Sequence, residues 1–420
     1  MTFLLIGILL LTSSITGTTT PTGMATAATT TITTGSFKIS DYMKQIIQSR
    51  IDNAGSNAAI VVGLVNSSGT QFYGYGKLSS SSSSNKTTVD KNTIFDIGSI
   101  TKTFTTTLLA DMVDHGIVNL NDPIQKYLPA TVKAPTFNNN DRQQPQQITL
   151  KDLATHTSGL PDYPANWPLY GVASEKYTIQ QMYQALSSVK LTRPPGTEYN
   201  YSDFGMGLLG DILASKSGIP YEQLVINKIL NPLGMNSTRI TLSDTLRSRL
   251  ASGHFNGQEV NPLLDLPPAL AAGGAFRSSA SDMVNYLSAN IGLTKTSLYN
   301  AMQESHMSRL NTNQTGVPGY KVYVGLGWFT TTATTATTTT AAKATNTSNN
   351  NNNNFNNDTI IWHNGIFNGY NSFIGFNPIK QRGIIILCSG VQQPYLTLIS
   401  QIGFGRFDNL SSLIWNLLNR

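Results

Sequence analysis

The sequence predicts a mixed α+β protein, and three observations favour that class. Strand-like segments begin the folded part of the chain and recur near its end. Helical segments lie between them, and turn residues separate the strand-like segments from the helical ones. The chain has 420 residues and 40% hydrophobic content, which is enough for one large two-part domain, or two ordinary ones, with a sizeable core.

The predicted strands lie toward both ends of the chain. Ala58–Val65 and Gln71–Tyr75 flank the turn Asn66–Gly69 and predict an antiparallel hairpin. The lone cysteine, Cys388, lies in a later apolar run, so we interpret it as core packing. A single cysteine excludes an internal disulfide and a thiolate metal cluster. The later segments with strand character are Tyr320–Val324, Thr359–Trp362, Tyr370–Phe376 and Gly383–Cys388.

The predicted helices lie mostly between these strands. Ile100 to His115 has apolar residues at helical spacing and ends at Gly116. From about Asn121 to Asp265, helical segments alternate with Pro- and Gly-rich loops, so we predict a helical insert over about residues 116–270. The helices predicted elsewhere in the chain or within the insert are Ile179–Val189, Asp203–Lys216, Ser281–Leu287 and Leu410–Leu418.

Residues 1–36 differ in composition from the rest of the chain. Met1 to Leu11 is a short apolar run that suits a secretory signal or an N-terminal membrane anchor, and Thr12 to Ser36 is typical of a Thr/Ser-rich stalk. We therefore expect a folded domain at 37–420 that is secreted or anchored at the cell surface. A second low-complexity tract, 330–357, is rich in Thr and Asn and predicts a disordered insertion.

Charge and motif content exclude several classes of function. The net charge is +6, but Lys and Arg are scattered, which argues against a nucleic-acid partner. The chain has no G-x-x-x-x-G-K-[ST], no G-x-G-x-x-G after a strand, no H-E-x-x-H and no G-x-S-x-G. Its five histidines are dispersed, so we expect neither a metal site nor a cofactor.

The candidate nucleophile is Ser99, in the sequence Gly-Ser-Ile-Thr-Lys at the start of a predicted helix. Residues three apart share a helix face, so the Lys102 amine can reach the Ser99 hydroxyl, which needs a neighbouring base to act as a nucleophile. The helix N-terminus also offers unpaired amide donors to a developing oxyanion. The S-x-x-K pattern alone has low specificity, because it recurs at Ser83 with Lys86 and at Ser187 with Lys190.

Five segments in a fixed order resemble the class C β-lactamase and D-Ala-D-Ala carboxypeptidase family, which includes penicillin-binding proteins and related esterases. The resemblance runs from about Phe37 to the C-terminus, apart from the Thr/Asn tract. The segments are FDIGSITKTF at 95–104, LATHTSGLP at 153–161, PPGTEYNYSD at 194–203, AGGAFRS at 272–278 and WHNG at 362–365.

The resemblance implies a β-lactamase/transpeptidase-like fold, with an antiparallel sheet flanked by helices and an inserted all-helical subdomain. It also implies a serine hydrolase that forms an acyl-enzyme on Ser99, with Lys102 and Tyr201 moving protons as a pair. Either of the two could be the base. His363 would present a cation or hydrogen-bond donor. The supporting residues would be Asn364, Gly365 and Ile366, with the amides of Ser99 and Ile366 as the oxyanion hole. Apart from the resemblance, we interpret His156 as a structural residue that holds the loop of the Thr-Ser-Gly-Leu-Pro segment.

Two positions depart from the family pattern. Asp203 stands where the family usually has Asn, and a carboxylate there could weaken Lys102 as a base, orient it, or bind a cationic substrate. His363 replaces a Lys, and the resemblance links a His there to D-peptidases and esterases more than to true β-lactamases. We therefore expect a small-molecule or peptide substrate with a reactive amide, ester or β-lactam carbonyl.

Two other functions stay open from the sequence. A non-catalytic penicillin-binding-like receptor or scaffold is favoured by Asp203, although such a protein has no need of a nucleophile beside a base. A glycosylated surface adhesin is suggested by the Thr-rich tracts and by Asn-x-Ser/Thr sites at Asn66, Asn236 and Asn409.

Overall fold

The computed structural model describes residues 37–53, 58–78, 88–138, 144–168, 176–260, 266–313, 319–333, 357–391 and 416–419. All of them belong to one compact unit, Phe37–Arg420. The predicted signal, anchor and stalk at 1–36 lie outside the described residues, as do residues 334–356 of the Thr/Asn tract and most of the predicted C-terminal helix. Within the described part of the chain, no helix is long and apolar enough to cross a membrane.

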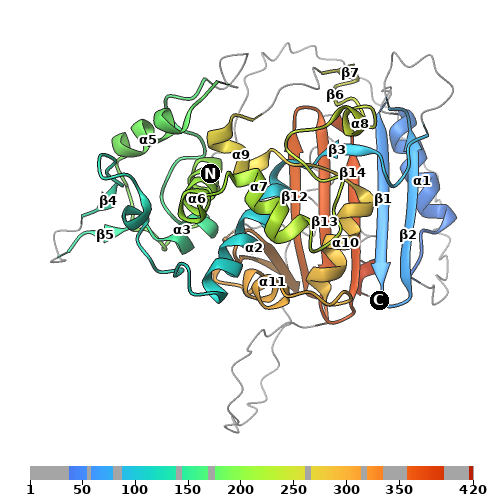
Figure 1. Ribbon diagram of the computed structural model, residues 1–420. Coiled ribbons are helices and arrows are strands. Elements are labelled where there is room, and N and C mark those ends of the chain that lie inside the picture. The colour runs from blue at the N-terminus through green and yellow to red at the C-terminus, as the bar shows by residue number, and fades with distance from the viewer. Residues whose placement is uncertain are drawn as a thin grey trace, which may run out of the picture. The chain divides into compact units, whose positions relative to one another are not determined.

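One large antiparallel sheet forms the centre of this unit (Figure 1). An early strand and a late strand of the chain pair within it, where Ile60 lies opposite Cys388. The sheet is therefore built from both ends of the domain, as predicted. Cys388 is buried, which confirms the core interpretation. In spatial order the strands are β2 (Gly69–Gly76), β1 (Ala59–Asn66), β14 (Arg382–Cys388), β13 (Tyr370–Asn377), β12 (Ile360–Phe367), β11 (Phe329–Ala333), β10 (Tyr320–Val324) and β9 (Leu310–Asn311).

Helices cover both faces of the sheet, because its central strands are apolar on both sides. In β1, Val61 and Val65 join one core cluster, while Ile60 and Leu64 point to a second cluster. The second cluster contains the apolar side of α1 (Asp41–Asn53), a helix that the sequence did not predict. On the other face lie α2 (Thr101–Asp114), α10 (Ala280–Ile291) and α11 (Tyr299–His306).

The segment between the early and late strands is mainly helical, as predicted, although it is not helical throughout. Two short hairpins lie within it, and their two-residue strands are too short to give an alternating pattern in the sequence. They are β4 (Thr136–Phe137) with β5 (Gln146–Gln147), and β6 (His254–Phe255) with β7 (Gln258–Glu259). The helices are α3 (Leu150–Ala154), α5 (Ile179–Ser188), α6 (Asp203–Ser217), α7 (Tyr221–Val225) and α8 (Asp244–Arg247).

The Thr/Asn tract was also predicted to begin too early. Thr330 to Ala333 lie in β11, between β10 and β12, and Thr331 is fully buried. Threonine is β-branched and suits a pleated strand, so composition alone misplaced the boundary of the tract.

Candidate active site

Ser99 lies in the 3₁₀ turn η1 (Gly98–Ile100), between β3 (Ile94–Asp96) and α2. Gly98 has φ +49°, and a Cβ there would lie 2.9 Å from the amide nitrogen of Ile366 in β12. The Gly98 amide donates to Asp96 Oδ1 at 2.8 Å, which fixes the turn. A glycine is therefore required at position 98, because the turn bends left-handed and lies directly against the sheet.

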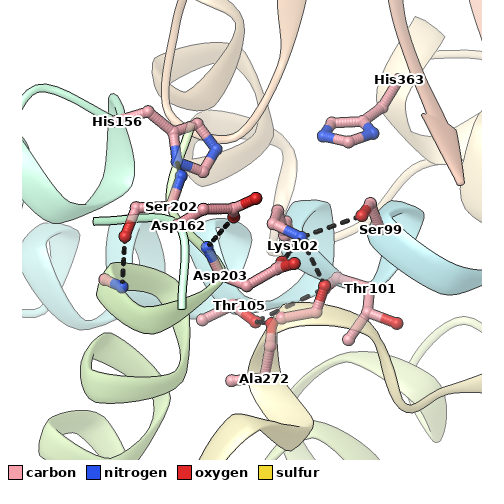
Figure 2. A network of polar contacts seen from close by, with 12 residues as sticks. Ser99, Thr101, Lys102, Thr105, His156, Asp162, Ser202, Asp203, Ala272 and His363 are labelled. Atoms are coloured by element: carbon pink, nitrogen blue, oxygen red, sulfur yellow. Dashed lines mark hydrogen bonds and ion pairs between the residues drawn. The ribbon is translucent and has the colours of Figure 1, made fainter. Parts of the chain in front are cut away.

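Lys102, one helical turn after Ser99, is fully buried and makes three hydrogen bonds (Figure 2). Its Nζ donates to Ser99 Oγ at 2.9 Å, to Asp203 Oδ1 at 2.5 Å and to the Gly273 carbonyl at 2.6 Å. Three is the full donor capacity of an ammonium group, so Lys102 is held as a cation with Asp203 as its counter-ion. The Ser99 hydroxyl receives one of these bonds and keeps its own proton free to donate.

Two glycines of α6 bring the partners of Lys102 together. A Cβ on Gly207 would lie 2.5 Å from the Ala269 carbonyl, and one on Gly210 would lie 2.2 Å from the Cβ of Ala272. Helix α6 therefore lies directly against α9 (Ala271–Gly274) and the turn before it. Asp203 begins α6 and Gly273 lies in α9, so this contact places both acceptors beside one amine.

Tyr201 is the second group beside the nucleophile. Its hydroxyl interacts with the Ser99 side chain, and the Lys102 Nζ lies 4.7 Å from the centre of its ring. Burial, and then the negative charge of Asp203, raise the pKa of Tyr201 well above its usual value. The resting residue is therefore a neutral phenol in contact with a cation.

His363, on β12, lies on the sheet side of the site, and its ring is turned toward the space beside Ser99 and Lys102 in Figure 2. Its Nδ1 donates to the Asn364 carbonyl at 2.6 Å, which leaves Nε2 as an unprotonated acceptor with no hydrogen-bond partner. Burial, and then the positive charge of Lys102, lower the pKa of His363 to about 3. The ring in this structure is neutral and presents an acceptor rather than the expected cation or donor, and the contact of His363 with a substrate stays a prediction.

The three residues after His363 form the edge of β12 beside Ser99. A Cβ on Gly365 would lie 2.0 Å from the Ile97 carbonyl, so this part of β12 contacts the turn η1 directly. The Ile366 side chain is 39% exposed. Because Gly98 also approaches the Ile366 amide, the structure brings the turn that carries Ser99 against the strand that carries Ile366.

Two residues of the site had no role assigned from the sequence. Asp162 accepts a hydrogen bond from the Asp203 amide at 3.3 Å, and the Tyr163 hydroxyl interacts with the Asp203 side chain. Burial, and then the charge of Asp203, raise the pKa of Asp162 to about 6. Both residues directly follow the sequence Gly-Leu-Pro161, and that adjacency was the available signal. Among the described residues, no group of three or more His, Cys, Asp and Glu side chains could hold a metal ion.

Comparison with known proteins agrees with this architecture. The family model for beta-lactamase matches residues 43–398. The D-alanyl-D-alanine-carboxypeptidase/endopeptidase AmpH of Escherichia coli is 34% identical over 56% of this chain, and the match spans only 60% of that relative. A beta-lactamase of Pseudomonas fluorescens is 26% identical over 83% of this chain and 93% of its own length. The solved β-lactamase/D-alanine carboxypeptidase of Yersinia pestis is 24% identical, with a TM-score of 0.66, over 88% of this chain and 94% of that one.

The fold and the Ser99–Lys102–Tyr201 arrangement define a protein of the β-lactamase/transpeptidase-like class. The chain belongs to the beta-lactamase family. The predictions of family and fold are confirmed, and the predicted class of enzyme, a β-lactamase-related serine hydrolase, agrees with this membership.

Proposed function

We propose that this protein is a serine hydrolase that forms an acyl-enzyme on Ser99. The observation that carries the proposal is the hydrogen bond between Ser99 Oγ and the buried Lys102 Nζ at 2.9 Å, with the Tyr201 hydroxyl beside the same serine. A serine with two proton-carrying neighbours in a buried site is equipped for nucleophilic attack on a carbonyl.

In the proposed reaction, Ser99 Oγ attacks the substrate carbonyl and the pair of Lys102 and Tyr201 carries the serine proton to the leaving group. The amides of Ser99 and Ile366 stabilise the oxyanion, since both lie where η1 meets β12. Water then releases the acyl group by the reverse proton movement. His363 accepts a hydrogen bond from the substrate through Nε2, the nitrogen that has no protein partner.

The proposed substrates are D-amino-acid peptides and esters rather than β-lactam antibiotics. AmpH, the 34% identical relative, is named as a D-alanyl-D-alanine carboxypeptidase and endopeptidase, which supports this choice. The His at position 363 is a second support, because the resemblance links a His there to D-peptidases and esterases more than to true β-lactamases.

The test compares wild type with Ser99→Ala on a short-chain activated ester, a D-amino-acid amide and a chromogenic β-lactam. We expect ester and D-amide turnover that disappears in Ser99→Ala, with slower turnover of the β-lactam. Mass spectrometry of the quenched wild type should find the acyl group on the peptide that contains Ser99. Equal inertness of wild type and variant on all three substrates contradicts the proposal.

One observation favours a second function, a non-catalytic binding protein. Asp203 holds Lys102 as a cation in the resting site, and an ammonium group cannot accept the serine proton until it loses one of its own. If the protein is a non-catalytic binding protein, Ser99→Ala binds a β-lactam with the same affinity as wild type, and no acyl group appears on Ser99 in wild type.

We propose in addition that the enzyme works outside the cytoplasm. The apolar run at 1–11 and the Thr/Ser-rich segment up to Ser36 support this location. The proposal covers both a secreted protein and one that is tethered to the membrane. Fractionation of cells that produce the full chain, with blotting for the protein, tests it.

A further inference from the structure

His156 is a buried histidine whose contacts converge on the segment that carries Tyr201. Its carbonyl accepts from the Asn200 amide at 2.7 Å, and its Nδ1 accepts from the Ser202 amide at 3.2 Å. Its imidazole stacks on the Tyr201 ring, with centroids 4.4 Å apart and planes 29° apart. One residue thus holds three consecutive positions, and the middle one is Tyr201.

We propose that His156 is a positioning residue for Tyr201, which fixes the phenol so that its hydroxyl meets Ser99. The inference rests on the proposed function, because it gives Tyr201 its place in the proton pathway. The other contacts of the Tyr201 side chain are with the Lys102 cation, with the Ser99 side chain and with the second core cluster.

The backbone of His156 supports a positional role. Its φ is +56°, a left-handed conformation that non-glycine residues adopt at a cost and that persists where the surroundings determine it. In this conformation the main chain and the ring of His156 both contact the 200–202 segment. A hydrogen bond from the Gly196 amide to the Thr157 carbonyl, at 2.9 Å, joins the same two loops a few residues earlier.

The protonation state of His156 separates positioning from charge stabilisation. Because Nδ1 accepts a hydrogen bond, the ring proton is on Nε2. Burial, and then the positive charge of Lys102, hold the pKa of His156 well below its usual value, so the ring is neutral. A neutral ring stacked on a phenol fixes its plane and supplies no net charge to it.

Another buried histidine provides a matched control. His306 lies in α11, packs edge-on against Trp328 and Phe376, and bonds Asn290 through Nε2 at 2.9 Å. Like His156, it is 1% exposed and contacts aromatic rings, but Asn290, Trp328 and Phe376 lie outside the site. Substitution of His306 therefore reports the cost of losing a buried imidazole alone.

Two variants of His156 separate the effect of its stacked ring from the effect of its hydrogen-bond acceptor. His156→Asn tolerates the left-handed backbone and keeps an acceptor near the position of Nδ1, but it removes the ring. His156→Phe keeps a ring and removes the acceptor. Since Phe is less tolerant of the backbone conformation, the melting temperature is recorded for each variant together with that of His306→Asn.

The first measurement does not depend on turnover. The protein is labelled with 3-fluorotyrosine, and the ¹⁹F NMR signal of Tyr201 is assigned as the one missing from Tyr201→Phe. We expect this signal to broaden in His156→Asn, because the phenol is no longer held in one orientation, in addition to the shift that loss of the ring current gives, and to broaden less in His156→Phe. A Tyr201 signal that does not broaden in a folded His156→Asn overturns the inference, even if the wild-type protein proves inert on every substrate.

The second measurement is the split between kcat and KM for the activated ester. A displaced phenol should lower kcat about 10- to 100-fold in His156→Asn with KM changed by less than about threefold, and His156→Phe should recover part of kcat. A loss of kcat no greater than that of His306→Asn, after correction for the folded fraction, overturns the inference. Inert wild type with a broadened Tyr201 signal in His156→Asn instead rejects the proposed function and keeps the positional role.

Discussion

At the scale of single residues, the site is organised around one buried cation. Lys102 has no exposed surface, and its charge is balanced by Asp203, whose side chain is 18% exposed. Isolated buried charges are strongly unfavourable, so the ion pair is as much a condition for folding as a feature of the chemistry. The carboxylate of Asp203 therefore stabilises the buried Lys102 ammonium, and a neutral amide at this position would stabilise it less.

Substitution of Asp203 tests this balance. Asp203→Ala should lower the free energy of unfolding by about 3 kcal/mol, because it leaves the Lys102 ammonium buried without a counter-ion. Asp203→Asn should lower it by about 1 kcal/mol, because the amide oxygen still accepts the hydrogen bond. Urea denaturation followed by circular dichroism measures both values.

An exposed ion pair serves as the control for that experiment. Lys44 and Asp41 pair at 2.9 Å with 40% and 90% of their side chains exposed, so Lys44→Gln should scarcely move the unfolding curve. A loss in Asp203→Asn no greater than that in Lys44→Gln would show that the charge of Asp203 does not stabilise Lys102, because the amide removes that charge and keeps the hydrogen-bond acceptor.

At the scale of elements, the close contact of α6 with α9 decides whether the site is assembled. Ser202 caps α6 by accepting from the Gly205 amide at 2.9 Å and donating to the Pro161 carbonyl at 2.6 Å, so the same residue ends one loop and starts the helix. Gly207 and Gly210 then let α6 approach α9, and Gly273 of α9 reaches Lys102. The sequence predicted the helix α6 well, but its glycines gave no sign of which partner they face.

Gly210→Ala tests the contribution of this contact. Its new methyl group would lie 2.2 Å from the Ala272 Cβ, so we expect α9 to shift, the free energy of unfolding to fall by about 1–3 kcal/mol, and kcat to fall as Gly273 moves from Lys102. Thermal unfolding and ester kinetics measure the two effects.

Gly218→Ala is the matched control on the same helix. Gly218 is the C-cap at φ +68° with open space around its missing side chain, so its substitution should cost about 1 kcal/mol of backbone strain and leave kcat unchanged. A Gly210→Ala variant with wild-type kcat would mean that α9 does not position Lys102.

At the scale of the whole molecule, buried histidines make stability depend on pH. His306 and His363 are both 1% exposed, and burial is the main cause that lowers each pKa to about 3, from an ordinary value of 6.5. Below pH 6.5 the unfolded histidines bind protons that the folded ones do not. Stability is therefore highest above that pH and is lost as the pH falls toward 3.

His306→Gln isolates one of these groups. Between about pH 6 and 4 the slope of the unfolding free energy against pH should decrease by about 1.4 kcal/mol per pH unit, because one fewer proton is taken up on unfolding. Urea denaturation at a series of pH values measures both slopes, and the difference at pH 8 gives the packing effect of the substitution alone. Parallel slopes for wild type and variant would contradict a neutral buried His306.

The sequence by itself determined what depends on near neighbours along the chain. Alternating and continuous apolar runs predicted β1, β10, β12, β13 and β14, and helical spacing predicted α2, α6 and α10, because these patterns follow from the geometry of each element. The contact of Ser99 with Lys102 was predictable for the same reason, because residues three apart at the start of a helix lie on the same face.

The tertiary structure alone decided what depends on distant contacts and on burial. Asp203 is 101 residues from Lys102 in the sequence and Gly273 is 171, so their convergence on one amine follows from the packing of α6 and α9. The neutral state of His363 depends on removal from water and on the Lys102 charge, neither of which a local sequence contains. For the same reason the sequence identified His156 only as a loop residue, whereas its contact with Tyr201 exists only in the folded chain.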